Sequence, residues 1–237
     1  IILGAVAWLN TKNYIPVDDK TVSQWSCGDI VVYSGQNYNT VQIGNQCWFK
    51  ENLNVGIRIN GTVNTTGNSV VEKYCYDDND MNCQIDGGLY QWNEAMGYVI
   101  TEGAQGICPS SWHIPRDSEQ YILESYLKDS ENLNENLCES NRDKFGCATA
   151  GTKLKVGGSS GFEGIFAGVR YVSADPGPFN GRGYGVSFWS SSQYDASSAV
   201  LRNLNLYYSG VLRGKNAEKD LGNAVRCLIH GFRSQGS

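Results

Sequence analysis

The chain has 237 residues, enough to bury a core of ordinary size as one large domain or one domain with an appendage. Its formal net charge is −5, and no run of Lys or Arg could neutralise a row of phosphates, so we expect no nucleic-acid partner. Charged residues make up only 18% while Gly, Tyr, Asn and Ser are plentiful, which predicts a loop-rich α+β domain of short antiparallel sheets and tight turns.

An apolar run opens the chain and is about half as long as the roughly 20 residues that cross a bilayer. No initiating Met and no basic segment precede it, so we expect the chain to be part of a longer gene product. The favoured interpretation is the tail of a longer membrane helix or filament-core helix, whose packing residues are Ile1, Ile2, Leu3, Val6, Trp8 and Leu9. The alternatives are an edge strand or short helix packed on its own domain, and a strand donated to a neighbouring subunit.

A polar connector with Pro16 follows, so we divide the chain into residues 1–26 and a main domain of residues 27–237. In that domain the β-rich runs Ile30–Tyr33 and Thr40–Ile43 are separated by Ser-Gly-Gln-Asn, which predicts an opening hairpin. Helices are predicted over residues 89–97 and 117–128, the second with Asp117 or Ser118 as its cap. Glycines punctuate the chain after Gly151, which predicts short strands and irregular loops there.

Eight cysteines stand beside only two histidines, and no Cys-x-x-Cys pair or paired Cys/His ligand set occurs. This pattern favours disulfides over a zinc or redox site and indicates a protein that works outside the cytoplasm. Two pairs enclose short polar segments that we expect to be closed at the base: Cys75 with Cys83, and Cys138 with Cys147.

Several aromatic-rich motifs resemble the Fibrobacter succinogenes major paralogous domain, in the order found in that family. They are Thr40–Asn54 (TVQIGNQCWFKENLN), Gly88–Met96 (GLYQWNEAM), Gly106–Glu119 (GICPSSWHIPRDSE), Gly161-Phe162, Phe188–Ser192 (FWSSS) and Val225-Arg226-Cys227. The resemblance covers about Gly28 to Leu228 and is specific, because each motif is rare and independent.

This resemblance implies a bacterial secreted or surface module with a C-type lectin-like fold, related to the formylglycine-generating-enzyme family. Members stand alone as lipoproteins or are attached to surface elements, including pilin-like N-terminal segments, and their activity is mostly unassigned. It also implies a disulfide between Cys108 and Cys227, which leaves Cys27 to pair with Cys47. The tryptophans within the motifs are expected in the core: Trp48, Trp92, Trp112 and Trp189.

The densest group of oxygen ligands is Asp77, Asp78 and Asp80, which could hold calcium in a clipped loop. The EF-hand pattern fails, however, because the sixth position lacks Gly and no Glu follows at the twelfth; the alternative is a solvated polar turn. Lectin-type sugar sites use a Glu-Pro-Asn or Gln-Pro-Asp tripeptide with a Trp-Asn-Asp-like strand. This chain instead has Asp175-Pro176-Gly177-Pro178 and Trp189-Ser190-Ser191, so it departs from the calcium-dependent sugar site.

Two nucleophile patterns occur, and neither predicts an enzyme. Ser159 lies in a Gly-x-Ser-x-Gly segment with Asp195 or Asp220 and His230 further on, yet the residues after it would make a poor helix. Cys108 and His113 could form a thiol–imidazole couple, but a disulfide at Cys108 would remove the thiol. The carboxylates Asp117 and Glu119 are explained by a helix start.

Aromatic residues in the loop-rich half are the candidates for a ligand surface: Tyr171, Phe179, Tyr184, Tyr194, Tyr207 and Tyr208. We expect an extracellular structural or adhesive protein, a pilin-like filament subunit that displays a lectin-like domain at the cell surface. Its partners would be identical subunits, through the N-terminal segment, and glycans or a host or neighbouring cell surface. The alternatives are an anchored carbohydrate-binding module and a secreted enzyme of unknown reaction. Apart from the calcium hypothesis, no cofactor is expected.

Overall fold

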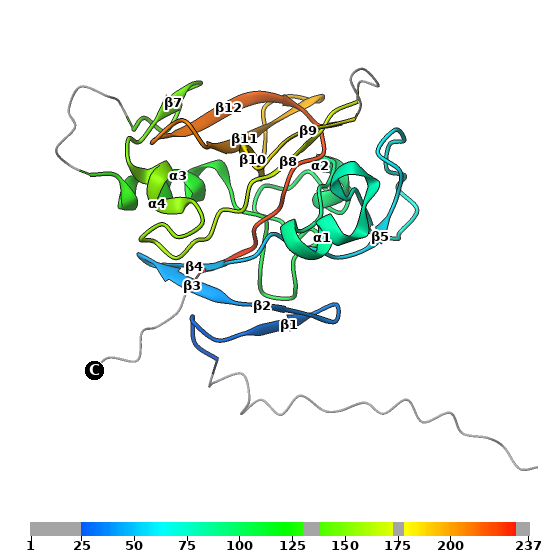
Figure 1. Ribbon diagram of the computed structural model, residues 1–237, viewed down its shortest axis with the longest axis horizontal. Helices are drawn as coiled ribbons and strands as arrows, with labels where there is room; N and C mark the ends of the chain where they lie inside the picture. The colour runs from blue at the N-terminus through cyan, green and yellow to red at the C-terminus, as the bar shows by residue number, and fades with distance from the viewer. Residues whose placement is uncertain (1–24, 130–137, 173–177, 231–237) are drawn as a thin grey trace, which may run out of the picture.

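The computed structural model of the protein describes residues 25–129, 138–172 and 178–230. Within these ranges, short helices pack between a six-stranded sheet and a three-stranded sheet, which confirms the predicted α+β class (Figure 1). The same ranges contain no helix with the length and apolar character needed to cross a bilayer.

Two tight hairpins open the domain, and they differ from the predicted one. β1 (Val31–Tyr33) pairs with β2 (Gln36–Tyr38) through Ser34 and Gly35, which both have positive φ. β3 (Thr40–Ile43) pairs instead with β4 (Gln46–Phe49). The predicted pairing of Ile30–Tyr33 with Thr40–Ile43 is therefore wrong, because a two-residue turn with two left-handed residues closes the first strand onto its immediate neighbour.

The three-stranded sheet has the order β13-β4-β3, so its central strand joins the two ends of the domain. β13 (Leu228–His230) is antiparallel to β4, and all four residues of β4 are buried. Trp25, which we placed in the connector, packs edge to face on Trp112 with ring centroids 5.5 Å apart.

The six-stranded sheet has the order β7-β12-β11-β10-β8-β9. Its strands are β7 (Phe145–Gly146), β8 (Ala167–Arg170), β9 (Phe179–Arg182), β10 (Gly185–Gln193), β11 (Ser198–Asn205) and β12 (Val211–Glu218). Strands β10, β11 and β12 have nine, eight and eight residues, so the prediction of only short strands after Gly151 is wrong. Glycines at 183 and 210 lie in the turns between strands and do not interrupt them.

The remaining elements are short: β5 (Ile57–Arg58), β6 (Glu72–Lys73), the 3-10 turn η2 (Tyr76–Asp78), α1 (Asp80–Asp86), α2 (Trp92–Ala95), α3 (Asp117–Leu127) and α4 (Ala150–Leu154). α3 confirms the helix predicted over residues 117–128, whereas the helix predicted over residues 89–97 is reduced to one turn. The N-cap of α3 is Arg116, whose backbone N–H donates to the Glu119 carboxylate at 2.7 Å. Neither Asp117 nor Ser118 is the cap.

The four motif tryptophans are buried, as predicted. Trp92 Nε1 donates to the Ser190 carbonyl at 2.8 Å, and Trp189 Nε1 donates to the Tyr90 carbonyl at 2.8 Å. Two of the motifs that carry the family resemblance therefore fix each other in the core, because each supplies the acceptor that a buried indole N–H needs.

Four disulfides join the expected pairs: Cys27–Cys47, Cys75–Cys83, Cys108–Cys227 and Cys138–Cys147. The Cys108–Cys227 bond spans 119 residues and attaches the segment before α3 to the residue that immediately precedes β13. It closes the longest loop of the four, so it removes the most freedom from the unfolded chain.

A buried network of ion pairs attaches α3 to the six-stranded sheet. Asp117 contacts Arg202 of β11 at 2.6 Å and Arg213 of β12 at 2.7 Å. Two turns further along, Glu124 pairs with Arg202 and with Arg142, and the side chain of Glu124 is 1% exposed. Burial alone would raise the pKa of Asp117, but hydrogen bonds and charge from Arg213 and Arg202 outweigh it and lower the pKa below 3.8.

Asp117→Asn should lower the free energy of unfolding at pH 7 by about 3 kcal/mol, since it leaves two buried guanidinium groups short of their counter-charge. A carboxylate whose pKa is depressed in the folded state stabilises above its unfolded pKa, and that contribution is lost as the pH falls from 3.8 through the lower folded pKa. Urea denaturation should therefore show a smaller difference from wild type at pH 3 than at pH 7. Asp143→Asn is the control: its pair with Lys215 is half-exposed at 3.7 Å, so a change below about 1 kcal/mol is expected. An equal loss in both variants would contradict this account.

Replacing Cys108 and Cys227 together by Ser should cost about 5 kcal/mol, against about 2.5 kcal/mol for Cys75 and Cys83, because loop-closure entropy grows with the residues enclosed. The separations are 119 and 8 residues. Denaturant midpoints and m-values of both double variants measure the difference. The opposite ranking would show that local packing around the short loop matters more than chain entropy.

Candidate ligand-binding site

A pocket of about 260 Å³ lies where the β8–β9 hairpin diverges from β10 and β11. β8 pairs with β10 in parallel at Gly168 and Val186, and the hairpin then separates from the sheet. The described lining residues are uncharged: Gly168, Val169, Tyr171, Asn180, Gly181, Tyr184, Gly185, Val186, Ser187, Asn203 and Asn205.

Amide side chains supply most of the hydrogen-bonding groups of this pocket. Asn203 and Asn205 are two apart on β11, so their side chains leave the same face of the strand, and Asn180 approaches from β9. Asn203 Nδ2 donates to the Val186 carbonyl and to Ser187 Oγ, both at 3.1 Å, which holds this amide in one orientation. A carboxamide both donates and accepts, so the pocket suits a ligand rich in hydroxyl groups.

Tyr171 and Tyr184 flank the pocket and are 42% and 57% exposed. Tyr184 follows Gly183 in the β9–β10 turn, where its backbone N–H donates to the Gly181 carbonyl at 3.0 Å. The backbone N–H of Tyr171 donates to the Pro178 carbonyl at 2.6 Å. The backbone of both tyrosines is therefore held by hydrogen bonds at positions next to the pocket amides.

The other aromatic candidates divide between the two ends of the six-stranded sheet. Tyr207 and Tyr208 lie in the β11–β12 turn at the same end as Tyr184, because the register places Gly185 opposite Asn205. Tyr194 lies in the β10–β11 turn at the other end of β10. Phe179 is half-buried against Tyr76, with centroids 5.4 Å apart, so it contributes to the core more than to the surface.

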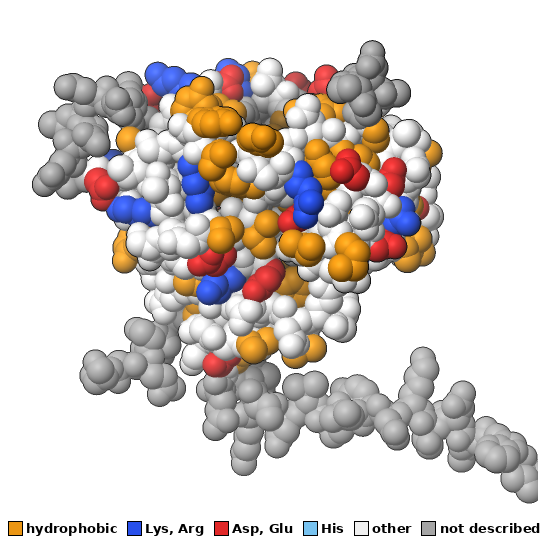
Figure 2. Space-filling view, in the orientation of Figure 1, with side chains coloured by type: hydrophobic (Ala, Val, Ile, Leu, Met, Phe, Trp, Pro, Cys, Tyr) orange, Lys and Arg blue, Asp and Glu red, His pale blue; other side chains and the backbone are white. Residues whose placement is uncertain are grey.

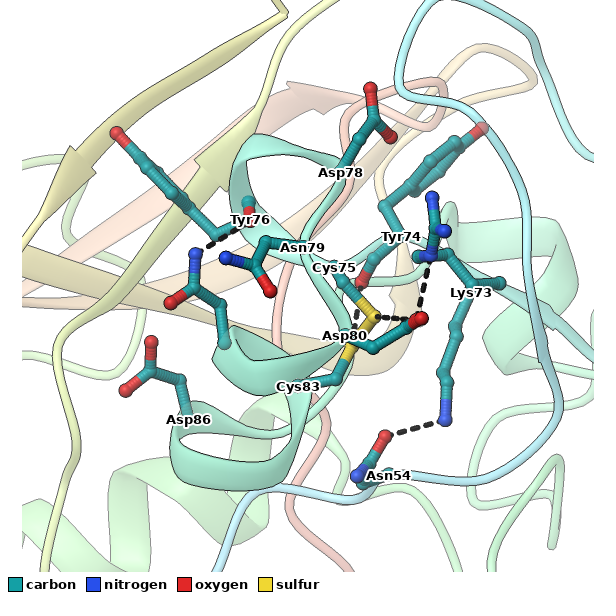
Figure 3. The surroundings of a disulfide bond; sticks show 12 residues. Asn54, Lys73, Tyr74, Cys75, Tyr76, Asp78, Asn79, Asp80, Cys83 and Asp86 are labelled. Carbon is teal, nitrogen blue, oxygen red and sulfur yellow. Dashed lines mark hydrogen bonds and ion pairs between the residues drawn. A yellow bond between two sulfur atoms is a disulfide. The ribbon is translucent and has the colours of Figure 1, made fainter.

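Of the candidate calcium ligands Asp77, Asp78 and Asp80, the last two do not converge on a common point (Figure 3). Asp80 Oδ1 pairs with Arg58 at 2.7 Å, whereas Asp78 Oδ1 accepts from the backbone N–H of Gly61 at 2.8 Å. Figure 3 shows the Asp78 and Asp80 carboxylates pointing in different directions around the Cys75–Cys83 disulfide. Among the described residues, no three His, Cys, Asp or Glu side chains are grouped so that they could hold a metal ion, so the geometry gives the calcium hypothesis no support.

The serine pattern lacks the geometry that a nucleophile elbow needs. Ser159 is exposed in a turn that follows α4, whereas an elbow joins a strand to a helix. Asp195 instead accepts hydrogen bonds from Ser198 and Ser197 in its own turn, which lowers its pKa to about 2. The backbone carbonyl of Asp220 accepts from Arg170, and His230 ends β13.

The thiol–imidazole couple is absent, because Cys108 is bonded to Cys227. His113 Nε2 contacts Glu119 Oε2 at 2.9 Å, next to the N-terminus of α3. The predicted assembly residues Ile1 to Leu9 and the segment Asp175-Pro176-Gly177 lie outside the described residues.

The pocket asparagines were missed by sequence reasoning. Asn is common in turns, so its abundance predicted loops and not a binding surface. The available signal was the alternation Asn203-Leu204-Asn205, which in a strand places both amides on one face and the leucine on the other.

The protein is a disulfide-stabilised α+β domain with a pocket that Tyr171 and Tyr184 flank and whose described lining is uncharged. The family model of the Fibrobacter succinogenes major domain matches residues 41–228, and the chain belongs to this family. Neither the curated proteins nor the solved structures contain a match to this chain.

Proposed function

We propose that this protein is an extracellular carbohydrate-binding module of C-type lectin-like fold, which holds a neutral sugar in the tyrosine-flanked pocket. The observation that carries the proposal is the combination of Tyr171 and Tyr184 with Asn180, Asn203 and Asn205 around one hollow. A pyranose presents hydroxyls that exchange hydrogen bonds with amides, and C–H faces that pack on aromatic rings. Binding sites that join aromatic surface to a few fixed polar groups are typical of small-molecule recognition.

The charge distribution also supports a neutral ligand. The described lining of the pocket has no Lys, Arg, His, Asp or Glu, so an anionic or cationic ligand would leave water without a counter-charge. On the face drawn in Figure 2, acidic and basic side chains are interspersed, and hydrophobic side chains gather over the six-stranded sheet.

The disulfides support the extracellular and lectin-like parts of the proposal. No free cysteine occurs among the described residues, and such a complete set of disulfides persists only in an oxidising compartment. In lectin-like folds a disulfide connects the region of a mid-chain helix to the last strand, and Cys108–Cys227 has this position beside α3 and β13. We propose a binding role and no catalytic one, since the described lining of the pocket offers no His, Asp, Glu, Lys or Cys to act as acid, base or nucleophile.

A filament role is a separate proposal that depends on Ile1 to Leu9, outside the described residues. If these residues form part of a filament core, native material with its full N-terminus should contain ordered filaments by electron microscopy, and deletion of the segment should abolish them. Only monomers or membrane-attached particles in both samples would contradict the pilin-like hypothesis and leave the anchored module.

Tyr184→Ala should weaken binding of a neutral monosaccharide about tenfold, because the ring supplies a stacking surface worth on the order of 1 kcal/mol. Tyr184→Phe should retain most of the affinity, since it keeps the ring. Tyr194→Ala is the matched control: Tyr194 is 54% exposed against 57% for Tyr184, but lies at the opposite end of the sheet. Titration calorimetry with glucose, mannose, galactose and N-acetylglucosamine measures these effects.

Removal of calcium by a chelator should leave that binding unchanged, because no described carboxylate lines the pocket. Loss of binding in the chelator, or equal loss in Tyr184→Ala and Tyr194→Ala, would place the sugar elsewhere and overturn the proposed site.

A further inference from the structure

We propose that the site recognises at least two adjacent units of a neutral glycan chain. One unit lies in the pocket, and the next lies on an apolar surface shelf formed by Leu206, Tyr207 and Tyr208. This inference rests on the proposed function and names its ligand class: an oligosaccharide or polysaccharide, bound along the chain.

The pocket is small for a site that encloses a whole ligand. At about 260 Å³ it is smaller than the roughly 300–1,000 Å³ of sites that enclose a drug-sized ligand. It fits a small part of a glycan, and a ligand that makes so few contacts binds weakly once the entropy of association is subtracted. Useful affinity would therefore need contacts on the surface beside the pocket.

The shelf begins where the pocket ends. The backbone N–H of Leu206 donates to the Tyr184 carbonyl at 2.8 Å, so the turn that carries the shelf is bonded to the residue that flanks the pocket. Asn205 belongs to both structures, because it lines the pocket while its Oδ1 accepts from the backbone N–H of Tyr207 at 3.0 Å.

The turn is held in place before any ligand arrives. Lys155 Nζ donates to the Tyr208 carbonyl at 2.7 Å and to the Leu206 carbonyl at 3.4 Å. The Tyr208 ring stacks on Phe145 with centroids 4.1 Å apart and planes 19° apart. A surface fixed in this way loses little conformational entropy on binding, which favours stacking of a sugar against it.

The side chains of the shelf are exposed to solvent. Tyr207 is 74% exposed, and Leu206 and Tyr208 are 49% and 51% exposed, so three neighbouring apolar side chains face water. Single exposed apolar residues need no explanation, but a contiguous group beside a polar pocket is typical of a binding surface.

Calorimetry with glucose, mannose, galactose and N-acetylglucosamine, and with their β-1,4-linked oligomers of two to six units, tests the inference on the full chain. For a series that binds, we expect the affinity of the wild type to rise about tenfold from one unit to two or three. Tyr207→Ala should bind the monomer as the wild type does but lose this rise, and Tyr207→Phe should keep it. Tyr184→Ala should weaken every length, and Tyr194→Ala should match the wild type.

The outcomes separate the two proposals. If the wild type binds neither monomers nor oligomers, the proposed function fails and this inference fails with it. If monomers bind but affinity does not rise with length, or if Tyr207→Ala keeps the full rise, only the two-unit inference is overturned. Thermal melting of each variant verifies that it is folded, which is expected because Tyr207 is on the surface.

Discussion

The ion pairs beneath α3 are the interaction on which the arrangement of the binding surface depends. Two carboxylates of one helix, Asp117 and Glu124, hold arginines from β11, from β12 and from the segment before β7. Removing one partner of such a buried pair leaves an uncompensated charge and costs about 3–5 kcal/mol, so these contacts strongly favour the observed packing of the helix on the strands. The same helix also bonds to β10, because the backbone N–H of Asp117 donates to Ser192 Oγ at 2.9 Å. α3 therefore contacts both strands of the β10–β11 pair, whose register brings Tyr184 next to the turn that carries Tyr207.

The motifs that mark the family lie mainly in the scaffold, and the candidate site lies between them. Trp92 and Trp189 each donate to a backbone carbonyl in the other's motif. Arg226 of the last motif, 1% exposed, donates to the carbonyls of Phe49 and Phe162. Burial lowers the pKa of Arg226 to about 9, because it disfavours the charged guanidinium. The two carbonyls and the ring faces of Phe162 and Phe188 stabilise that charge in the core. The described residues that line the pocket lie within 168–171, 180–187 and 203–205, outside the quoted motifs. The family motifs thus account for the buried scaffold, whereas the choice of ligand depends on pocket residues outside these motifs.

The sequence predicted the features whose signal is local or chemically specific. The Cys75–Cys83 and Cys138–Cys147 bonds followed from close spacing, α3 from its start signals, and the buried tryptophans from the motifs. The β10–β12 strands were missed because Gly, Ser and Asn, frequent in their sequence, usually indicate turns, and only tertiary pairing decides otherwise. The sequence analysis named two of the pocket residues, Tyr171 and Tyr184, among six aromatic candidates. Nothing local distinguishes them from Tyr194, since the end of a sheet at which a turn lies depends on strand register.

The central position of β4 also constrains how the chain reaches its fold. β4 lies early in the sequence, yet β13 and Arg226 must arrive to complete its pairing, and the contact between Arg226 and Phe49 spans 177 residues. Contacts of such separation form slowly, because a long loop must close first. Until residues 226–230 are made, one edge of an apolar, fully buried strand stays open to other chains. A nascent or truncated chain is therefore a candidate for chaperone protection, and the final strand acts as the built-in cover of that edge.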